Sequence, residues 1–152
     1  VLKEVKLILK LIGMGGTFDR LHEGHEFLIK TALRLSENIV IGLTSQELTK
    51  HKKHAEKIQD YTNRKTNLIE FIKSFADITR VKIVKLEDPY GPPIHDPEYE
   101  GLIASEETYE GALKINKIRE EKNFPPLIII IIPILKDENN QKISSSALRS
   151  RL

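Results

Sequence analysis

The residues best suited to chemistry lie in one short segment near the N-terminal end of the chain. Gly15 and Gly16 allow a ligand to approach the backbone closely, and Thr17 adds a hydroxyl group directly after them. His22 and His25 follow where a helix is expected to begin. Backbone N–H groups at a helix N-terminus attract anions, and imidazoles add hydrogen-bond donors there without a heavy charge. The segment predicts a phosphate site with no nucleophile and no obvious base, which suits displacement at phosphorus by positioning and electrostatics.

Other kinds of site fit this segment less well. A dinucleotide-binding fingerprint needs a third glycine at the position of Phe18, and no Gly-Lys-Ser or Gly-Lys-Thr follows that would form a P-loop. His22 and His25 could chelate a metal ion, but no third ligand lies at a suitable spacing, so no metal site is expected. A histidine at a helix start is often a simple cap. Phe18 is also compatible with a place in the core, and Asp19 with a purely structural role in the turn.

A second anion-binding segment lies close to the C-terminal end. Three consecutive hydroxyl side chains, Ser144, Ser145 and Ser146, stand where a helix is expected to begin, and Arg149 follows near its second turn. Ordinary N-capping would explain one of these serines, and a solvated arginine needs no explanation. Two phosphate-binding segments in one chain suit a triphosphate.

Strands and helices alternate along the chain, and they must position these two segments. Apolar runs predict strands at residues 5–12, 39–43, 81–86, 101–104 and 127–132, with a glycine-rich turn at 13–16. Apolar residues at helical spacing, or capping signals, predict helices at 24–35, 61–76, 106–123 and 144–151, and prolines make 88–98 a loop. Ser105 is the expected cap of the helix at 106–123, and the strand at 127–132 is expected to be covered on both faces.

This alternation predicts an α/β fold: a Rossmann-like parallel sheet with helices on both faces. In such sheets ligands bind at the carboxyl ends of the strands, near the point where the strand order reverses. The first strand–helix junction, which carries the glycines and histidines, is therefore the expected site.

Composition restricts the class of protein. The chain has 152 residues, 24 Lys and Arg against 22 Asp and Glu, and no Cys, which excludes disulfides, thiolate metal sites and a cysteine nucleophile. The net charge of +2 is too small to imply nucleic-acid binding. No apolar run approaches the roughly 18 residues of a membrane span, and the N-terminal residues lack a signal-peptide core. We expect one domain over residues 1–152, cytoplasmic, with neither nucleic acid nor membrane as a partner.

The motifs together resemble a known superfamily. Gly-Thr-Phe-Asp at 16–19, His-x-Gly-His at 22–25 and Ile-Ser-Ser-Ser-x-x-Arg at 143–149 resemble the HxGH nucleotidyltransferases. The segments 88–92, 105–109 and 112–119 are similar to those of the archaeal and eukaryotic-type phosphopantetheine adenylyltransferases. The resemblance covers nearly the whole chain and implies a nucleotidyltransferase-type fold.

The resemblance implies the reaction of ATP with 4′-phosphopantetheine, giving dephospho-coenzyme A and pyrophosphate. The acceptor phosphate would attack the α-phosphorus of ATP in line, without a covalent enzyme intermediate and with Mg²⁺ on the phosphates. By motif, Thr17 would contact the reacting phosphates, His25 would stabilise the transition state and His22 would bind the nucleotide phosphates. Ser144, Ser145 and Ser146 would line the ATP side, and Glu110 would contact the nucleotide.

A basic stretch at 50–57 is the remaining candidate. Relatives place a basic residue from this region over the phosphates, and we expect Lys53 in that role, with Lys57 as the second choice. A solvated surface loop is the alternative. Arg64 is expected to pair with a carboxylate or to reach a substrate phosphate. The expected catalytic residues are thus Thr17, His25 and Lys53, and the expected binding residues are Gly15, Gly16, Phe18, His22, Glu110, Ser144, Ser145, Ser146 and Arg149.

Two other functions remain open from the sequence. Nicotinamide-mononucleotide, cytidylyl and flavin-adenylyl transferases would share both phosphate segments and differ in the acceptor pocket. A non-catalytic nucleotide-binding or nucleic-acid-binding module could also keep the fold, although the intact histidines and serines argue against it. The oligomeric state is open.

Overall fold

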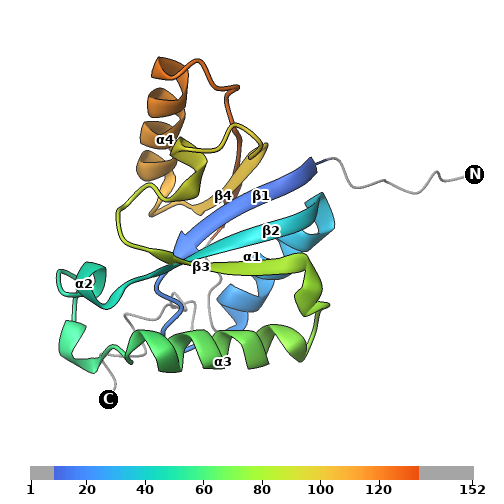
Figure 1. Cartoon of the computed structure of the whole chain (residues 1–152). Helices are drawn as coiled ribbons and strands as arrows, with labels where there is room; N and C mark the ends of the chain where they lie inside the picture. Colours follow the sequence, from blue (N-terminus) through green and yellow to red (C-terminus); the bar gives the residue numbers. More distant parts are fainter. Residues whose placement is uncertain (1–8, 134–152) are drawn as a thin grey trace, which may run out of the picture.

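Residues 9–133, which the computed structural model describes, form a parallel sheet of five strands in the order β3-β2-β1-β4-β5 (Figure 1). The strands are β1 (Leu9–Gly16), β2 (Ser36–Thr44), β3 (Val81–Leu86), β4 (Gly101–Ser105) and β5 (Ile128–Ile132). The longer helices are α1 (Glu23–Leu35), α3 (Tyr61–Lys73) and α4 (Tyr109–Glu121). The short helices are α2 (Gln46–Thr49), η1 (Ala55–Lys57), η2 (Ile78–Arg80) and η3 (Pro92–Ile94).

Helices cover both faces of this sheet, as Figure 1 shows. Ile29 of α1 and Leu68 of α3 belong to one buried cluster, which includes Ile12 and Ile41 of the sheet. The opposite face has a second cluster, in which α4 packs on β4 and β2. The predicted fold class is confirmed. Because the chain runs β1-β2-β3 in one direction and then starts again at β4 on the other side of β1, the strand order reverses between β1 and β4.

The first strand lies further along the chain than the sequence suggests. A strand at 5–12 followed by a glycine turn was the expectation, but β1 runs from Leu9 through Gly16. Gly13 and Gly15 have register partners in β2, at Val40 and Gly42. The central position of β1, between β2 and β4, outweighs the low strand propensity of glycine. The expected glycine turn is therefore wrong: the glycines are part of the sheet.

The helix predicted at 106–123 begins later. Ser105 is the last residue of β4 and not the cap; α4 starts at Tyr109, with Thr108 at the N-cap position. The Ser105 N–H donates to Thr108 Oγ1 at 2.9 Å, so the intervening residues form a turn. This turn places the first residues of α4 beside the carboxyl end of the sheet.

Strand β5 differs from its expectation in environment. Ile128 is 55% exposed and Ile131 is 41% exposed, so this strand is not covered on both faces as its unbroken apolar run suggested. It is the last strand in the order of the described sheet. The predicted helix at 144–151 lies outside the described residues. No helix within residues 9–133 is long and apolar enough to cross a membrane.

Candidate functional site

The two histidines lie together at the start of α1. His22 is the N-cap residue, and its Nδ1 accepts a hydrogen bond from the Gly24 N–H at 3.0 Å. His25, in the first turn, accepts from the His22 backbone N–H through its own Nδ1 at 3.2 Å. The ring centroids are 4.0 Å apart. Both imidazoles therefore satisfy helix N–H groups that would otherwise lack partners, as capping side chains do.

Gly24 permits this arrangement through its lack of a side chain. A Cβ atom at position 24 would lie 2.7 Å from His22 Cε1 and 2.9 Å from His22 Nδ1. Any other residue would have to displace the His22 ring from the helix end. The Gly within the His-x-Gly-His motif thus follows from close approach of an imidazole to the backbone.

The capping bonds determine the tautomer of the histidines, and burial keeps the rings neutral. Each Nδ1 accepts a hydrogen bond, so the proton of a neutral ring is assigned to Nε2. Burial, and to a lesser degree the neighbouring His22, lowers the pKa of His25 to about 3, and burial also lowers the pKa of His22. His22 Nε2 is buried and has no hydrogen-bond partner among the described residues. The pair thus offers neutral Nε2–H donors, which suit an anionic ligand.

The residues between β1 and α1 hold this junction in place. Phe18 is buried in the core, has a positive φ of 49°, and packs its ring 5.2 Å from that of His25. Asp19 is fully buried and accepts a hydrogen bond from the Gln59 N–H at 3.2 Å. Arg20 donates to the Lys57 carbonyl at 3.0 Å. Phe18 therefore supports His25, and the next two residues fasten the segment at 57–59 to the junction.

Thr17 belongs to a buried hydrogen-bonded group. Its Oγ1 accepts from the Thr44 hydroxyl at 3.2 Å, and its carbonyl accepts from Arg64 Nη1 at 3.0 Å. Arg64 Nη1 also donates to Thr44 Oγ1 at 3.3 Å, and its Nε donates to the Gln59 carbonyl at 2.9 Å. Arg64 was expected to pair with a carboxylate or to reach a phosphate. Among the described residues, its hydrogen bonds go to two carbonyls and a hydroxyl.

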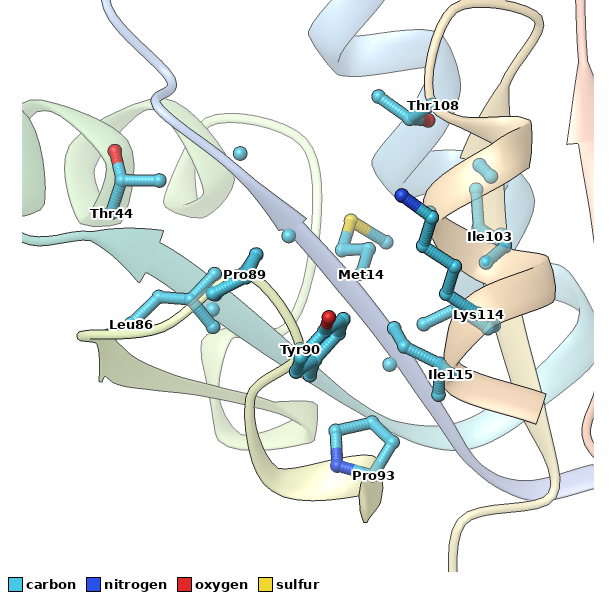
Figure 2. A pocket seen from close by; sticks show the side chains of 18 of the residues that line it. Met14, Thr44, Leu86, Pro89, Tyr90, Pro93, Ile103, Thr108, Lys114 and Ile115 are labelled. Atoms are coloured by element: carbon cyan, nitrogen blue, oxygen red, sulfur yellow. The ribbon is translucent and has the colours of Figure 1, made fainter. Parts of the chain in front are cut away.

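A cavity of about 540 Å³ opens at the carboxyl ends of the central strands, next to the strand-order reversal. We call it the central cavity. Figure 2 shows one wall formed by β3 and the loop after it, and the facing wall by β4 and α4. The labelled wall residues are Leu86, Pro89, Tyr90 and Pro93 on the first side and Ile103, Thr108, Lys114 and Ile115 on the second. Its volume and largely apolar walls are typical of a small-molecule site.

The glycines of β1 make room for this cavity. Gly13, Gly15 and Gly16 all line it. At Gly15 a Cβ atom would lie 3.4 Å from the Leu86 side chain, and across the sheet a Cβ at Gly42 would lie only 2.9 Å from Leu86. Larger residues on this face of β1 and β2 would fill the cavity floor.

Two lysines contribute positive charge to the central cavity. Lys52, in the loop after α2, and Lys114 of α4 both line it, and so does the predicted binding residue Glu110. Lys53 and Lys57 do not line this cavity, although they neighbour Lys52 in sequence. The basic stretch therefore reaches the site through a residue that the sequence did not single out.

Some expectations cannot be placed in this geometry. Ser144, Ser145, Ser146 and Arg149 lie outside the described residues. Residues 9–133 contain no group of three or more His, Asp or Glu side chains that could hold a metal ion. Gly15, Gly16 and Glu110 lie at the cavity, whereas the histidine pair lies at the adjacent helix start.

Sequence reasoning missed four residues of this site: Thr44, Lys52, Tyr90 and Lys114. Thr44 carries a usable signal, because it is a polar residue at the end of a buried strand, where ligands bind in parallel sheets. Lys114 has none, since an exposed lysine on a helix is ordinary.

Residues 14–151 match the family model described as cytidylyltransferase-like. The chain is 43% identical over 143 residues to a phosphopantetheine adenylyltransferase from Pyrococcus abyssi, covering 94% of this chain and 90% of the relative. A relative of the same name from Pyrococcus horikoshii gives the same identity and coverage. A crystal structure of a protein with unknown function from Archaeoglobus fulgidus superposes with a TM-score of 0.71 at 30% identity, covering 90% of this chain and 100% of that chain. The residues that match the family model include both predicted phosphate-binding segments.

Proposed function

The chain belongs to the cytidylyltransferase-like family and, within it, to the phosphopantetheine adenylyltransferases, and from this membership we propose that it transfers the adenylyl group of ATP to 4′-phosphopantetheine. A phosphate oxygen of the acceptor forms a bond to the α-phosphorus of ATP while the bond from that phosphorus to the β-phosphate bridging oxygen breaks. The products are dephospho-coenzyme A and pyrophosphate, a step of coenzyme A synthesis.

The observation that carries this proposal is the position of the central cavity beside the glycine-rich end of β1, with the histidine pair at the start of the following helix. An adenylyltransferase must hold two phosphate-bearing substrates side by side at one point. A cavity for one substrate and a set of N–H donors for the other meet this requirement where β1 ends.

The central cavity suits the acceptor. Its apolar walls, including Tyr90 and Ile115, fit the methylene and dimethyl groups of a pantetheine arm. Lys52 and Lys114 supply cationic groups for the 4′-phosphate. We assign the phosphate contact to Lys52 in place of Lys53, because Lys52 is the residue that lines the cavity.

His25 and Thr17 are assigned to the reacting phosphates. A neutral imidazole with its proton on Nε2 donates a hydrogen bond to a phosphoryl oxygen as negative charge accumulates there. Thr17 follows Gly16, a residue of the cavity wall, and its hydroxyl is proposed to serve the same purpose. His22, with its unpartnered Nε2, is assigned to the phosphates of ATP that leave as pyrophosphate.

The remaining contacts follow from the family resemblance. Glu110, at the first turn of α4, is proposed to contact the nucleotide, and it lines the central cavity. Ser144, Ser145, Ser146 and Arg149 are proposed to bind ATP. Lys53 and Lys57 remain candidates for nucleotide phosphates that lie beyond the cavity.

Mg²⁺ is proposed to arrive as a complex with ATP. The described residues offer no cluster of carboxylates and imidazoles for a resident metal ion, which fits an ion held chiefly by phosphate oxygens and water. The ion would neutralise phosphate charge that the neutral histidines leave in place. No protein ligand to it is assigned.

Pyrophosphate release from ATP and Mg²⁺ tests the proposal directly, with 4′-phosphopantetheine and nicotinamide mononucleotide as parallel acceptors. Pyrophosphate release is expected with 4′-phosphopantetheine and not with nicotinamide mononucleotide. A His25→Ala variant should lose most of this turnover while still folding, with a somewhat lower thermal unfolding midpoint because the cap acceptor of the His22 N–H is lost. Release with nicotinamide mononucleotide instead would assign a different acceptor. Release with neither acceptor, despite ATP binding, would reject catalysis.

A further inference from the structure

Arg64 is a buried cation that contacts Thr17 and Thr44 but does not line the central cavity. The residue has 0% relative exposure, and its guanidinium donates to the Thr17 carbonyl and to Thr44 Oγ1. Burial lowers the pKa of Arg64, and the buried carboxylate of Asp19 opposes this effect. An arginine remains protonated in proteins and has no acceptor atom. The hydrogen bond to Thr44 can therefore have only one direction, from Arg64 to the threonine.

That direction determines the use of the Thr44 hydroxyl. Thr44 Oγ1 accepts from Arg64 at 3.3 Å, so its own proton is available elsewhere, and it is donated to Thr17 Oγ1 at 3.2 Å. Thr17 Oγ1 is then an acceptor within the protein. The hydrogen bonds among the described residues leave the single proton of the Thr17 hydroxyl for another acceptor.

The place of these threonines gives that acceptor its chemical class. Thr44 ends β2 and lines the central cavity, and Thr17 directly follows Gly16, which ends β1 and also lines it. Figure 2 shows Thr44 at the cavity with Leu86 and Pro89. An acceptor that enters here beside Thr17 is a phosphoryl oxygen if the proposed function is right.

We propose that Thr44 and Arg64 are positioning residues that orient the Thr17 hydroxyl, so that its proton points to a phosphoryl oxygen of the reacting substrates. The chain of donors runs from the Arg64 guanidinium through Thr44 to Thr17. Each donor in such a chain polarises the next, so the last hydroxyl is a stronger donor than an isolated one. Because its direction is fixed before the substrate binds, no reorganisation is needed as charge develops at phosphorus.

This inference rests on the proposed function, and a double-mutant cycle separates the two. The variants are Thr17→Val, Thr44→Val and the double variant, with Thr44→Ser retaining the hydroxyl. Ser36→Ala is the matched control, since Ser36 is a fully buried hydroxyl at the opposite end of the same strand. Pyrophosphate release gives kcat and the KM of each substrate, and thermal unfolding monitors the fold.

Thr44→Val is expected to lower kcat by roughly tenfold, which is the size of one hydrogen bond used in the transition state. The same substitution in the Thr17→Val background should change kcat by less than about twofold, because Thr44 acts only through Thr17. Thr44→Ser should restore most of the activity, and Ser36→Ala should keep the wild-type kcat.

Four results would overturn the inference. Wild-type kcat in Thr44→Val would reject the relay while leaving the proposed function intact. Equal losses from Thr44→Val in both backgrounds would show that Thr44 acts independently of Thr17. A loss in Thr44→Ser as large as that in Thr44→Val would show that the methyl group and packing matter, not the hydroxyl. Absence of turnover by the wild-type chain would reject the proposed function and the relay with it.

Discussion

Burial of a neutral histidine at the start of α1 should make the stability of the protein depend on pH. The pKa of His25 is lowered from 6.5 to about 3. Between these values the unfolded chain binds a proton at this residue and the folded chain does not, so the free energy of unfolding falls as the pH is lowered from 6.5. At about pH 5, which is 1.5 units below the unfolded value, the loss is about 2 kcal/mol. Above pH 6.5 the contribution is fully present.

Urea unfolding at about pH 7.5 and about pH 5 measures this difference, and the His25→Asn variant identifies its source. An asparagine oxygen can replace Nδ1 as the acceptor of the His22 N–H, so the cap is retained while the titrating group is removed. His51→Asn, at an exposed position in the loop after α2, controls for loss of an imidazole as such.

The expected result is a pH-dependent loss in the wild type that is about 2 kcal/mol larger than in His25→Asn and is retained in His51→Asn. NMR titration of the His25 imidazole provides a direct check, with no protonation expected between pH 5 and pH 8. Equal losses in the wild type and His25→Asn would show that His25 titrates normally in the folded protein. The assignment of a neutral Nε2–H donor would then be wrong.

Three further predictions concern the site and its frame. Gly24→Ala should lower the thermal unfolding midpoint and raise the KM for ATP, because the new Cβ displaces the His22 ring. Helix propensity alone would stabilise the protein by about 1 kcal/mol, so a higher midpoint would refute the steric argument. Lys52→Ala should raise the KM for the acceptor by roughly tenfold, whereas Lys53→Ala should stay within about twofold, and the reverse order would reassign the phosphate contact. Arg119→Met should destabilise the protein by about 3 kcal/mol, or roughly 10 °C in Tm. The fully buried Arg119 side chain donates to the carbonyls of Pro93 and Tyr99, which precede β4 in the chain, and of Pro125, which follows α4. An unchanged Tm would contradict this.

The sequence predicted the elements whose signals are local. Helix α1 and strand β3 appear within a residue of their expected bounds, because their caps and apolar spacing lie within the segments themselves. The bounds of β1 were not predictable in the same way. Gly13, Gly15 and Gly16 have low strand propensity, and their pairing with β2, together with that of Gly13 with β4, makes them part of a strand. The late start of α4 likewise depends on a turn between Ser105 and Thr108 that no propensity identifies.

The site, like the fold, was predictable from the sequence only where its contacts are local in the chain. The histidine motif could be recognised because its capping bonds connect residues three positions apart or fewer. The choice between Lys52 and Lys53 could not be made, because it depends on how distant contacts hold the loop. Asp19 binds the backbone of Gln59 and Arg20 binds that of Lys57, and these contacts join segments about 40 residues apart. The same limit applies to Arg64, because its hydrogen-bond partners come from separate strands and loops.

The site has charged lysines at the central cavity and neutral hydrogen-bond donors at the histidine pair, and this division has a chemical reason. Lys52 and Lys114 place positive charge at the central cavity, where a phosphate-bearing acceptor must be attracted and retained. His22 and His25 lie with their rings 4.0 Å apart, where two imidazolium ions would repel each other. Burial lowers the pKa of both rings, and the capping bonds to Nδ1 leave the proton of each neutral ring on Nε2. In the proposed relay, Arg64 acts on the reacting phosphates only through a hydroxyl. Donors of this kind strengthen as charge develops in the transition state, yet they bind the departing pyrophosphate less tightly than a cation would. Under the proposed function, the bonds that cap α1 therefore also decide the tautomer in which the histidines meet ATP.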